Sequence, residues 1–373
     1  MRFLVLDTAY PAFLSWLYAQ HPGLDEKPFD EQLRVYTDAC YGQAGFCTSN
    51  LRVLGQEAYH IPVNSELSQR QWAREHGLKM SPGWRWEFRL RRGIVPWASR
   101  NQLNRWFYEI LAEQIRHYKP DVIVNLAMDG INTGFLQETK RYTRLLVGQI
   151  AAPLPQGETW STYDLVISSL PNFVEYFRSL GIHSEFNCLA FEPSVLRHLQ
   201  TQEKKFLVSF VGSFTGAHSK RDQLLTYLCS NLPINVWGTG IERLPQDSPI
   251  RGRYLGTAWG TDMFKILAAS KIVVNHHIDI AQSYANNMRL FEATGTGALL
   301  ITDSKDNLPA MFEPAKEVIA YRNPEECGEL IRYYLEHNGE RETIAASGQR
   351  RTLESHTYLH RMQDLVRIVH KFL

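Results

Sequence analysis

Small and basic residues gather in one short segment of the second half of the chain. Gly212 and Ser213 end a β-branched run. Three basic residues follow where a helix is expected to begin: His218, Lys220 and Arg221. Small residues at a strand-to-helix turn let backbone N–H groups approach an anion, and the helix N-terminus adds positive charge. The segment therefore favours phosphate contact, and a tight turn without a ligand is the alternative.

A second polar segment lies about sixty residues further on. Asn275 follows a predicted strand, and Asn286 and Asn287 precede a predicted helix. Within that helix Arg289 and Glu292 are three positions apart, so both side chains can point into the same cleft. An ordinary surface ion pair is the alternative interpretation.

Two aspartates follow predicted strands of the first half. Asp129 comes shortly after the strand at 122–125, and Asp7 ends the first strand. A carboxylate at the carboxyl end of a strand faces the crevice where α/β proteins bind ligands, and it can deprotonate a hydroxyl group there. Asp129 is the first candidate for a general base and Asp7 the second, although either could instead cap a helix or brace a turn.

Metal ligands are not expected. The five cysteines contain no C-x-x-C pair, and the pair Asp303 and Asp306 reads as a loop after a strand. His276 and His277 are adjacent, so in an extended segment their side chains point to opposite faces. At most one of them can therefore reach the cleft, and we interpret these histidines as structural.

The elements that must position these residues follow an alternating pattern of short apolar runs and amphipathic helices, which predicts parallel sheets covered by helices. The pattern occurs twice, and periodicity is lost over 189–205. We therefore expect an α/β protein with doubly wound domains at 1–190 and 203–373, the last helix crossing back to the first domain. The expected strands lie at 3–6, 57–62, 122–125, 145–150, 165–168, 184–188, 206–212, 234–237, 272–275, 298–302 and 318–320.

Composition narrows the class of protein. The 373 residues carry 40 Lys and Arg against 39 Asp and Glu, which argues against nucleic-acid binding through bulk charge. Hydrophobic residues make up 44%, enough for two cores. The first apolar run is too short for a signal peptide and no run is long enough to span a membrane, so we expect a cytoplasmic protein.

Residues 84–97 combine three tryptophans with four arginines. Aromatic faces stack on sugar rings, and arginines bind phosphates or anionic head groups. One interpretation is an acceptor-binding wall, and another is peripheral contact with the inner face of a membrane. An amphipathic helix packed on the first domain is the third.

The stretch from Arg289 to Asp303 resembles the donor-binding signature of GT-B glycosyltransferases. The longer stretch from Asn286 to Asp303, with His356 and Arg361 downstream, is similar to the spore maturation protein CgeB-like glycosyltransferase group. The resemblance covers nearly the whole chain, more strongly in the second half, and includes Gly212, Ser213, Arg221, Gly238 and Asn275.

The resemblance implies a GT-B fold, in which two Rossmann-like domains face a cleft, and a hexosyltransferase-type activity. The second domain would hold a nucleotide-diphosphate sugar, Glu292 would accept hydrogen bonds from the ribose, and Arg289 with Arg221 or Lys220 would neutralise the diphosphate. The first domain would bind a glycan, lipid-linked or small-molecule acceptor. No metal or other cofactor is implied.

One position departs from this pattern. Retaining GT-B enzymes carry a further glutamate eight positions before the ribose-binding one, but this chain has Tyr284 there. A retaining mechanism therefore cannot be transferred, and two alternatives stay open: a catalytically silent nucleotide-sugar-binding protein and a nucleotide-sugar epimerase. The sequence does not select the base, the sugar or the acceptor.

Overall fold

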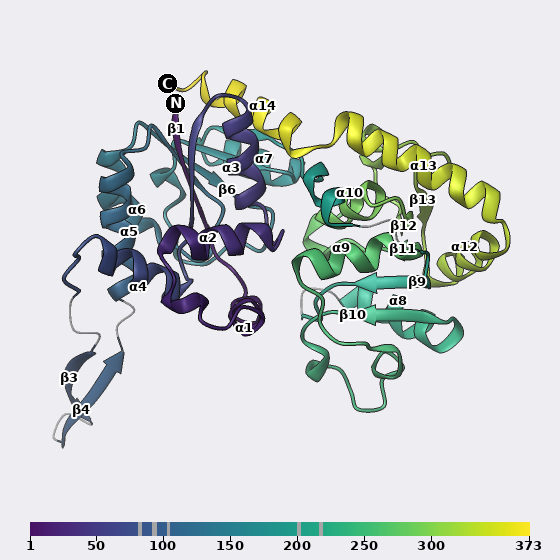
Figure 1. Ribbon diagram of the computed structural model, residues 1–373, viewed down its shortest axis with the longest axis horizontal. Coiled ribbons are helices and arrows are strands. Elements are labelled where there is room, and N and C mark those ends of the chain that lie inside the picture. Colours follow the sequence, from purple (N-terminus) through teal and green to yellow (C-terminus); the bar gives the residue numbers. More distant parts are fainter. Residues whose placement is uncertain (81–83, 92–94, 103–104, 200–202, 216–218) are drawn as a thin grey trace.

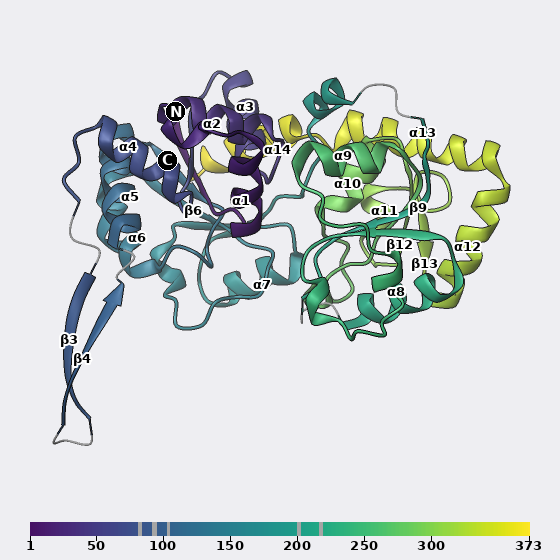
Figure 2. The same cartoon turned by 60° about the horizontal axis from the view of Figure 1, so that its bottom comes forward.

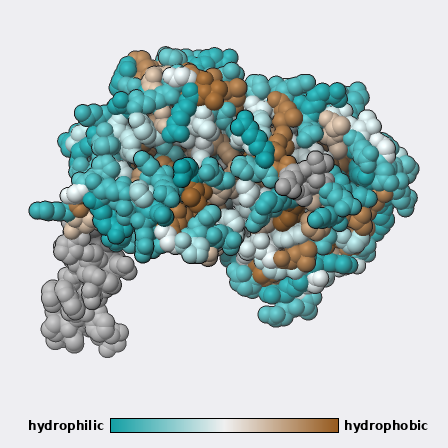
Figure 3. All heavy atoms as spheres, viewed as in Figure 1, coloured by the Kyte–Doolittle hydropathy of each residue, from teal (hydrophilic) through white to brown (hydrophobic). Residues whose placement is uncertain are grey.

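The computed structural model describes residues 1–80, 84–91, 95–102, 105–199, 203–215 and 219–373. The chain forms two α/β domains that lie side by side, each built on a parallel sheet (Figures 1 and 2). This arrangement confirms the predicted fold class. Hydrophilic side chains cover most of the face seen in Figure 3, in keeping with the balanced charge.

The N-terminal domain has a six-stranded sheet in the order β2-β1-β5-β6-β7-β8, with every neighbouring pair parallel. Nearly continuous β-branched and leucine runs form its strands because both faces of the sheet are buried. The strands are β1 (Arg2–Asp7), β2 (Glu57–Pro62), β5 (Val122–Asn125), β6 (Leu145–Gln149), β7 (Leu165–Ser168) and β8 (Ser184–Phe186). The helices are α1 (Pro11–Gln20), α2 (Phe29–Asp38), α3 (Ala44–Val53), α4 (Glu66–Glu75), α5 (Arg105–Tyr118), α6 (Thr133–Thr139) and α7 (Pro171–Ser179).

The C-terminal domain repeats the plan with five parallel strands in the order β10-β9-β11-β12-β13. Its strands are β9 (Phe206–Val211), β10 (Ile234–Trp237), β11 (Ser270–Val274), β12 (Leu299–Asp303) and β13 (Ile319–Tyr321). The helices are α8 (Ser219–Asn231), α9 (Gly260–Ala268), α10 (Met288–Gly295), α11 (Leu308–Met311), α12 (Pro324–Glu336), α13 (Asn338–Ser355) and α14 (Tyr358–Val369). No helix in the described parts of the chain is both long and apolar enough to span a membrane.

Residues 84–97 do not form the amphipathic helix offered as one interpretation. They belong to an antiparallel hairpin of β3 (Trp84–Arg91) and β4 (Val95–Gln102), which pairs with neither large sheet. In both views the hairpin extends from the side of the N-terminal domain opposite the C-terminal domain (Figures 1 and 2). An acceptor wall at the cleft is therefore wrong for this segment. Residues 92–94, 103 and 104 lie outside the described residues.

The last helix, α14, returns to the N-terminal domain and packs against α3, so both chain ends lie on that domain (Figure 1). Two connections between the domains run beside each other, because Phe191 and Thr357 form a parallel bridge. The Phe191 N–H donates to the His356 carbonyl over 2.9 Å, and the Tyr358 N–H donates to the Phe191 carbonyl over 3.0 Å. These hydrogen bonds link the two connections between the domains.

A glycine permits a further close contact between the domains. Gly260 begins α9 with φ +48°, and a Cβ there would lie 1.9 Å from the carbonyl oxygen of Ala39 in the N-terminal domain. The neighbouring Thr261 N–H donates to that same oxygen over 3.0 Å. Only glycine combines this backbone conformation with this close approach.

His356 lies in the second connection between the domains, and its imidazole is neutral. Its Nε2 lies 2.9 Å from the Met311 carbonyl oxygen and its Nδ1 lies 2.7 Å from an Arg361 nitrogen. Since Arg361 can only donate, Nδ1 accepts and Nε2 carries the proton. Burial, reinforced by the charges of Arg361 and Arg351 but opposed by the Met311 bond, lowers the pKa of His356 to about 4.

We expect this histidine to make the protein sensitive to acid. The pKa of His356 in the folded protein lies below the unfolded value of about 6.5. The contribution of the neutral histidine to the free energy of unfolding is therefore complete above pH 6.5. That contribution, at most about 3 kcal/mol, is lost as the pH falls towards 4. His356→Gln should flatten the decline in unfolding free energy over that interval, measured by urea titration. The exposed His370→Gln is the matched control. Parallel declines in His356→Gln and wild type would refute this role.

Candidate functional site

A cavity of about 610 Å³ lies between the two domains, at the carboxyl ends of strands from both sheets. Asp7 ends β1, Gly212 and Gly238 follow β9 and β10, and Asn275 follows β11. Ligands bind at this edge in open α/β sheets. The remaining lining residues are Thr8, Tyr10, Cys40, Tyr41, Gly42, Gln43, Leu126, Asp129, Ala152, Phe210, Val211, Ser213, Arg221, Thr239, Ala258, Trp259, Gly260, Met263, His276, Ile278, Asn287, Met288, Arg289 and Glu292.

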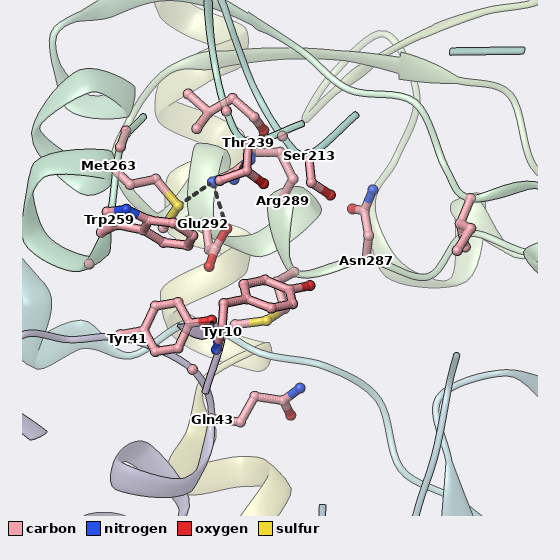
Figure 4. Close-up of a pocket in the computed structure, with 18 of the residues that line it drawn as sticks. Tyr10, Tyr41, Gln43, Ser213, Thr239, Trp259, Met263, Asn287, Arg289 and Glu292 are labelled. Atoms are coloured by element: carbon pink, nitrogen blue, oxygen red, sulfur yellow. Dashed lines mark hydrogen bonds and ion pairs between the residues drawn. The ribbon is translucent and has the colours of Figure 1, made fainter. Parts of the chain in front are cut away.

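Arg289 and Glu292 form an ion pair in the cavity wall (Figure 4). Arg289 Nη1 lies 2.6 Å from Glu292 Oε2, and Nη2 donates to the Val211 carbonyl over 3.2 Å. The two side chains are 14% and 6% exposed, which is much less than a surface pair would be. The interpretation as an ordinary surface pair is therefore wrong.

The Glu292 carboxyl is buried at the cavity surface. Burial raises its pKa, and the Arg289 guanidinium opposes that rise. In the described structure Arg289 Nε is buried without a hydrogen-bond partner. Glu292 lines the cavity, and a carboxylate there is able to accept hydrogen bonds from a bound diol.

Asn287 connects the helix start to the neighbouring strands. Its Oδ1 accepts from the Leu290 N–H over 3.1 Å and so caps α10, while its Nδ2 donates to Asn275 Oδ1 over 2.7 Å. Asn275 in turn donates to Thr302 over 2.9 Å. Asn286, predicted to bind the donor, is buried but is absent from the lining, because adjacent residues in the extended segment before a helix point in different directions.

Two glycines form a narrow edge of the cavity. A Cβ on Gly238 would lie 1.7 Å from the Gly212 carbonyl oxygen, so the turns after β9 and β10 touch through their backbones. A Cβ on Gly212 would lie 2.8 Å from the Phe210 ring. The missing side chains let these backbones pack this closely. Both glycine N–H groups are occupied, because Gly212 donates to the Trp237 carbonyl and Gly238 to the Gly256 carbonyl, each over 3.0 Å, so neither is free to bind a phosphate.

The predicted basic cluster is only partly at this edge. Arg221 lines the cavity, donates to the Ser213 carbonyl and lies 5.5 Å from the Phe210 ring centroid. Burial lowers the pKa of Arg221 to about 10, which leaves it charged at neutral pH. Lys220 is exposed and does not line the cavity, and His218 lies outside the described residues.

The adjacent histidines have different surroundings, and only His276 reaches the cavity, in agreement with the expectation that at most one of them would. His276 lines the cavity, and its Nδ1 lies 2.9 Å from the Tyr321 hydroxyl. His277 is buried and lies 2.6 Å from Asp303 Oδ1. Burial would raise the pKa of Asp303, but His277, His276 and Lys305 outweigh it and hold that pKa well below its usual value. Within the described residues, no three His, Cys, Asp or Glu side chains gather as a metal-binding group.

The two candidate bases reach the cavity from the N-terminal domain in different ways. Asp7 is 7% exposed, and its Oδ1 lies 2.8 Å from His60 Nε2 while Oδ2 accepts from the Tyr36 hydroxyl over 3.5 Å. Asp129 is exposed, in a turn after β5. Asp7 is therefore held in one orientation by the neighbouring strand and helix, whereas Asp129 is open to solvent.

An aromatic group at the cavity was missed by sequence reasoning. Tyr10 and Tyr41 come from the N-terminal domain and Trp259 from the C-terminal domain, with ring centroids 5.8–6.4 Å apart. In Figure 4 these rings and Gln43 lie opposite Asn287 and Ser213. Aromatic residues in turns occur in many cores, so no spacing signal distinguishes them before the domains are placed together.

Comparison with solved structures shows the fold class: the chain has the GT-B fold. It aligns over its full length with Anabaena Alr3699/HepE in complex with UDP-glucose, at TM-score 0.58 and 11% identity, covering 100% of that chain. A glycosyltransferase from Rickettsia africae ESF-5 gives TM-score 0.57 and 11% identity over 100% of this chain and 98% of that one. The pneumococcal O-GlcNAc transferase GtfA, in complex with UDP and GlcNAc, gives 0.56 and 8% over 100% and 99%.

Family comparison supports the same class from the sequence side. Residues 221–367 match the family described as glycosyl transferase-like. This segment runs from α8 to α14 and contains Asn275, Arg289 and Glu292. None of the curated proteins matches the sequence.

Proposed function

We propose that the protein is a glycosyltransferase that moves a sugar, of the hexose type, from a nucleoside-diphosphate sugar to an acceptor hydroxyl, and that it belongs to the CgeB-like group. The observation that carries the proposal is the buried Arg289–Glu292 pair, which faces the cavity beside the glycine edge. A carboxylate suits a ribose diol, and a guanidinium suits a diphosphate. UDP is the nucleotide to test first, because similar structures contain it.

In the proposed reaction Asp7 is the general base and the displacement is inverting. Asp7 takes the proton of the acceptor hydroxyl, the oxygen attacks the anomeric carbon, and the bond from that carbon to the diphosphate breaks with its electron pair leaving on the diphosphate. Arg289 and Arg221 stabilise the leaving charge. We favour Asp7 over Asp129 because His60 and Tyr36 fix the orientation of its carboxylate.

The proposal also covers the need for a metal ion and the cellular location. Because arginines supply the positive charge, we propose that transfer needs no metal ion. The five cysteines are free, which agrees with a reducing compartment, and we propose a cytoplasmic location. Contact of residues 84–97 with a membrane is not part of the proposed function.

Calorimetric titration with UDP, GDP and dTDP, followed by a transfer assay in EDTA, tests the function. We expect one nucleotide to bind and its sugar conjugate to support transfer. Failure of all three nucleotides to bind would refute the proposal. Tight binding without turnover would indicate a silent binding protein, and conversion of the donor without an acceptor would indicate an epimerase.

A further inference from the structure

The two walls of the cavity carry opposite charges. Its cationic residues, Arg221 and Arg289, come from the C-terminal domain. Among the described lining residues of the N-terminal domain there are two carboxylates, Asp7 and Asp129, and no Lys, Arg or His. A phosphate on a second ligand would therefore meet like charge at the N-terminal wall and no cation to pair with it.

The same wall presents an aromatic surface. Tyr10 is 58% exposed although its ring lies 6.1 Å from Trp259 and 6.4 Å from Tyr41. Phe13 stacks on Tyr41 at 3.7 Å and supports the group from behind. An open ring face held by other rings offers apolar area to a flat ligand without a large ordering cost.

The N-terminal wall also carries polar acceptors. Asp7 and Gln43 line the same wall as Tyr10. Carboxylate and amide oxygens accept hydrogen bonds from hydroxyl groups. An aromatic alcohol would satisfy the ring but would leave these polar groups facing apolar atoms.

We propose that the acceptor is an uncharged carbohydrate, whose ring lies on Tyr10 and whose hydroxyls bind Asp7 and Gln43. Acceptors that bring a phosphate or carboxylate into the cleft are excluded by the charge of Asp7 and Asp129. This inference rests on the proposed function, which it deepens by naming the acceptor class.

Matched ligands test the charge argument. A methyl hexoside and its 6-phosphate are titrated, with and without UDP, and binding is followed by ligand-observed NMR. We expect the neutral glycoside to bind at least about tenfold more tightly. Equal or tighter binding of the phosphate ester would overturn the inference, and so would the absence of binding by both. Failure of UDP to bind would count against the proposed function instead.

Substitutions distinguish a loss of glycoside binding at this surface from a general loss of stability. Tyr10→Ala should weaken glycoside binding at least about tenfold, whereas Tyr10→Phe should retain it, because the ring and not the hydroxyl provides the contact. The side chain of Tyr10 makes no cap hydrogen bond to α1, and the 41%-exposed Tyr176→Ala is the matched control outside the cavity. Asp129→Asn should tighten binding of the 6-phosphate. Unchanged glycoside affinity in Tyr10→Ala would also overturn the inference.

Discussion

Glu292→Gln is expected to weaken UDP binding about thirtyfold to one hundred and fiftyfold. The substitution keeps the shape but removes the charge, and a hydrogen bond to a charged group contributes about 2–3 kcal/mol. It also removes the negative charge that lies 2.6 Å from the Arg289 guanidinium in a buried wall. Calorimetric titration of UDP into each variant measures the change, and Glu292→Ala should lose more because it provides no acceptor.

The control for this prediction is another glutamate in an ion pair three positions apart. Glu313 pairs with Lys316, but both side chains are more than half exposed and lie outside the cavity. Glu313→Gln should leave UDP affinity unchanged, because exposed pairs contribute little. Wild-type affinity in Glu292→Gln, with the protein folded by circular dichroism, would remove the ribose-binding role from this carboxylate.

Asp7→Asn is expected to lower turnover at least about a hundredfold while UDP affinity stays unchanged. Asparagine is nearly the same size, its amide oxygen can accept from His60, and its NH2 group can donate to the Tyr36 hydroxyl, so the local packing should survive. What it cannot do is take the proton from an acceptor hydroxyl. The measurement is the rate of sugar transfer at saturating donor, paired with a UDP titration of the same preparation.

Asp129→Asn makes the matched comparison, because it is the same substitution at the same cavity. Asp129 is exposed, so we expect a smaller loss of turnover with an uncharged acceptor. A hundredfold loss confined to Asp129→Asn would assign the base to Asp129. Near-normal turnover in both variants would assign the proton transfer to neither aspartate.

Much of the fold could be predicted because buried parallel strands consist largely of short runs of β-branched residues. The strands expected at 57–62, 122–125, 165–168 and 234–237 agree with the structure at both ends. Helix α3 was missed, since its buried residues include Gly45, Thr48 and Asn50, which disguise the apolar face. The hairpin at 84–102 was missed because its tryptophans and arginines resemble an amphipathic helix.

The residues of the candidate site also differ in how well the sequence alone predicts their position. Residues of the donor side adjoin strand ends, so Gly212, Asn275 and Asn287 could be placed in the cleft from local sequence. Tyr10, Tyr41 and Trp259 could not, because their meeting depends on how two domains pack. Asn286 and Lys220 show the remaining error: sequence locates a segment but does not say which of two neighbouring side chains faces the ligand.

The return of α14 to the N-terminal domain also sets the order in which the protein can be completed during synthesis. Helix α3 and strand β1 leave the ribosome early, yet Met362 and Leu365 of α14 share their core. Domains usually fold as they emerge, from the N-terminus onward. Here the first domain must wait for the end of the chain before its apolar surface is covered, so the nascent protein exposes that surface through the synthesis of the entire second domain.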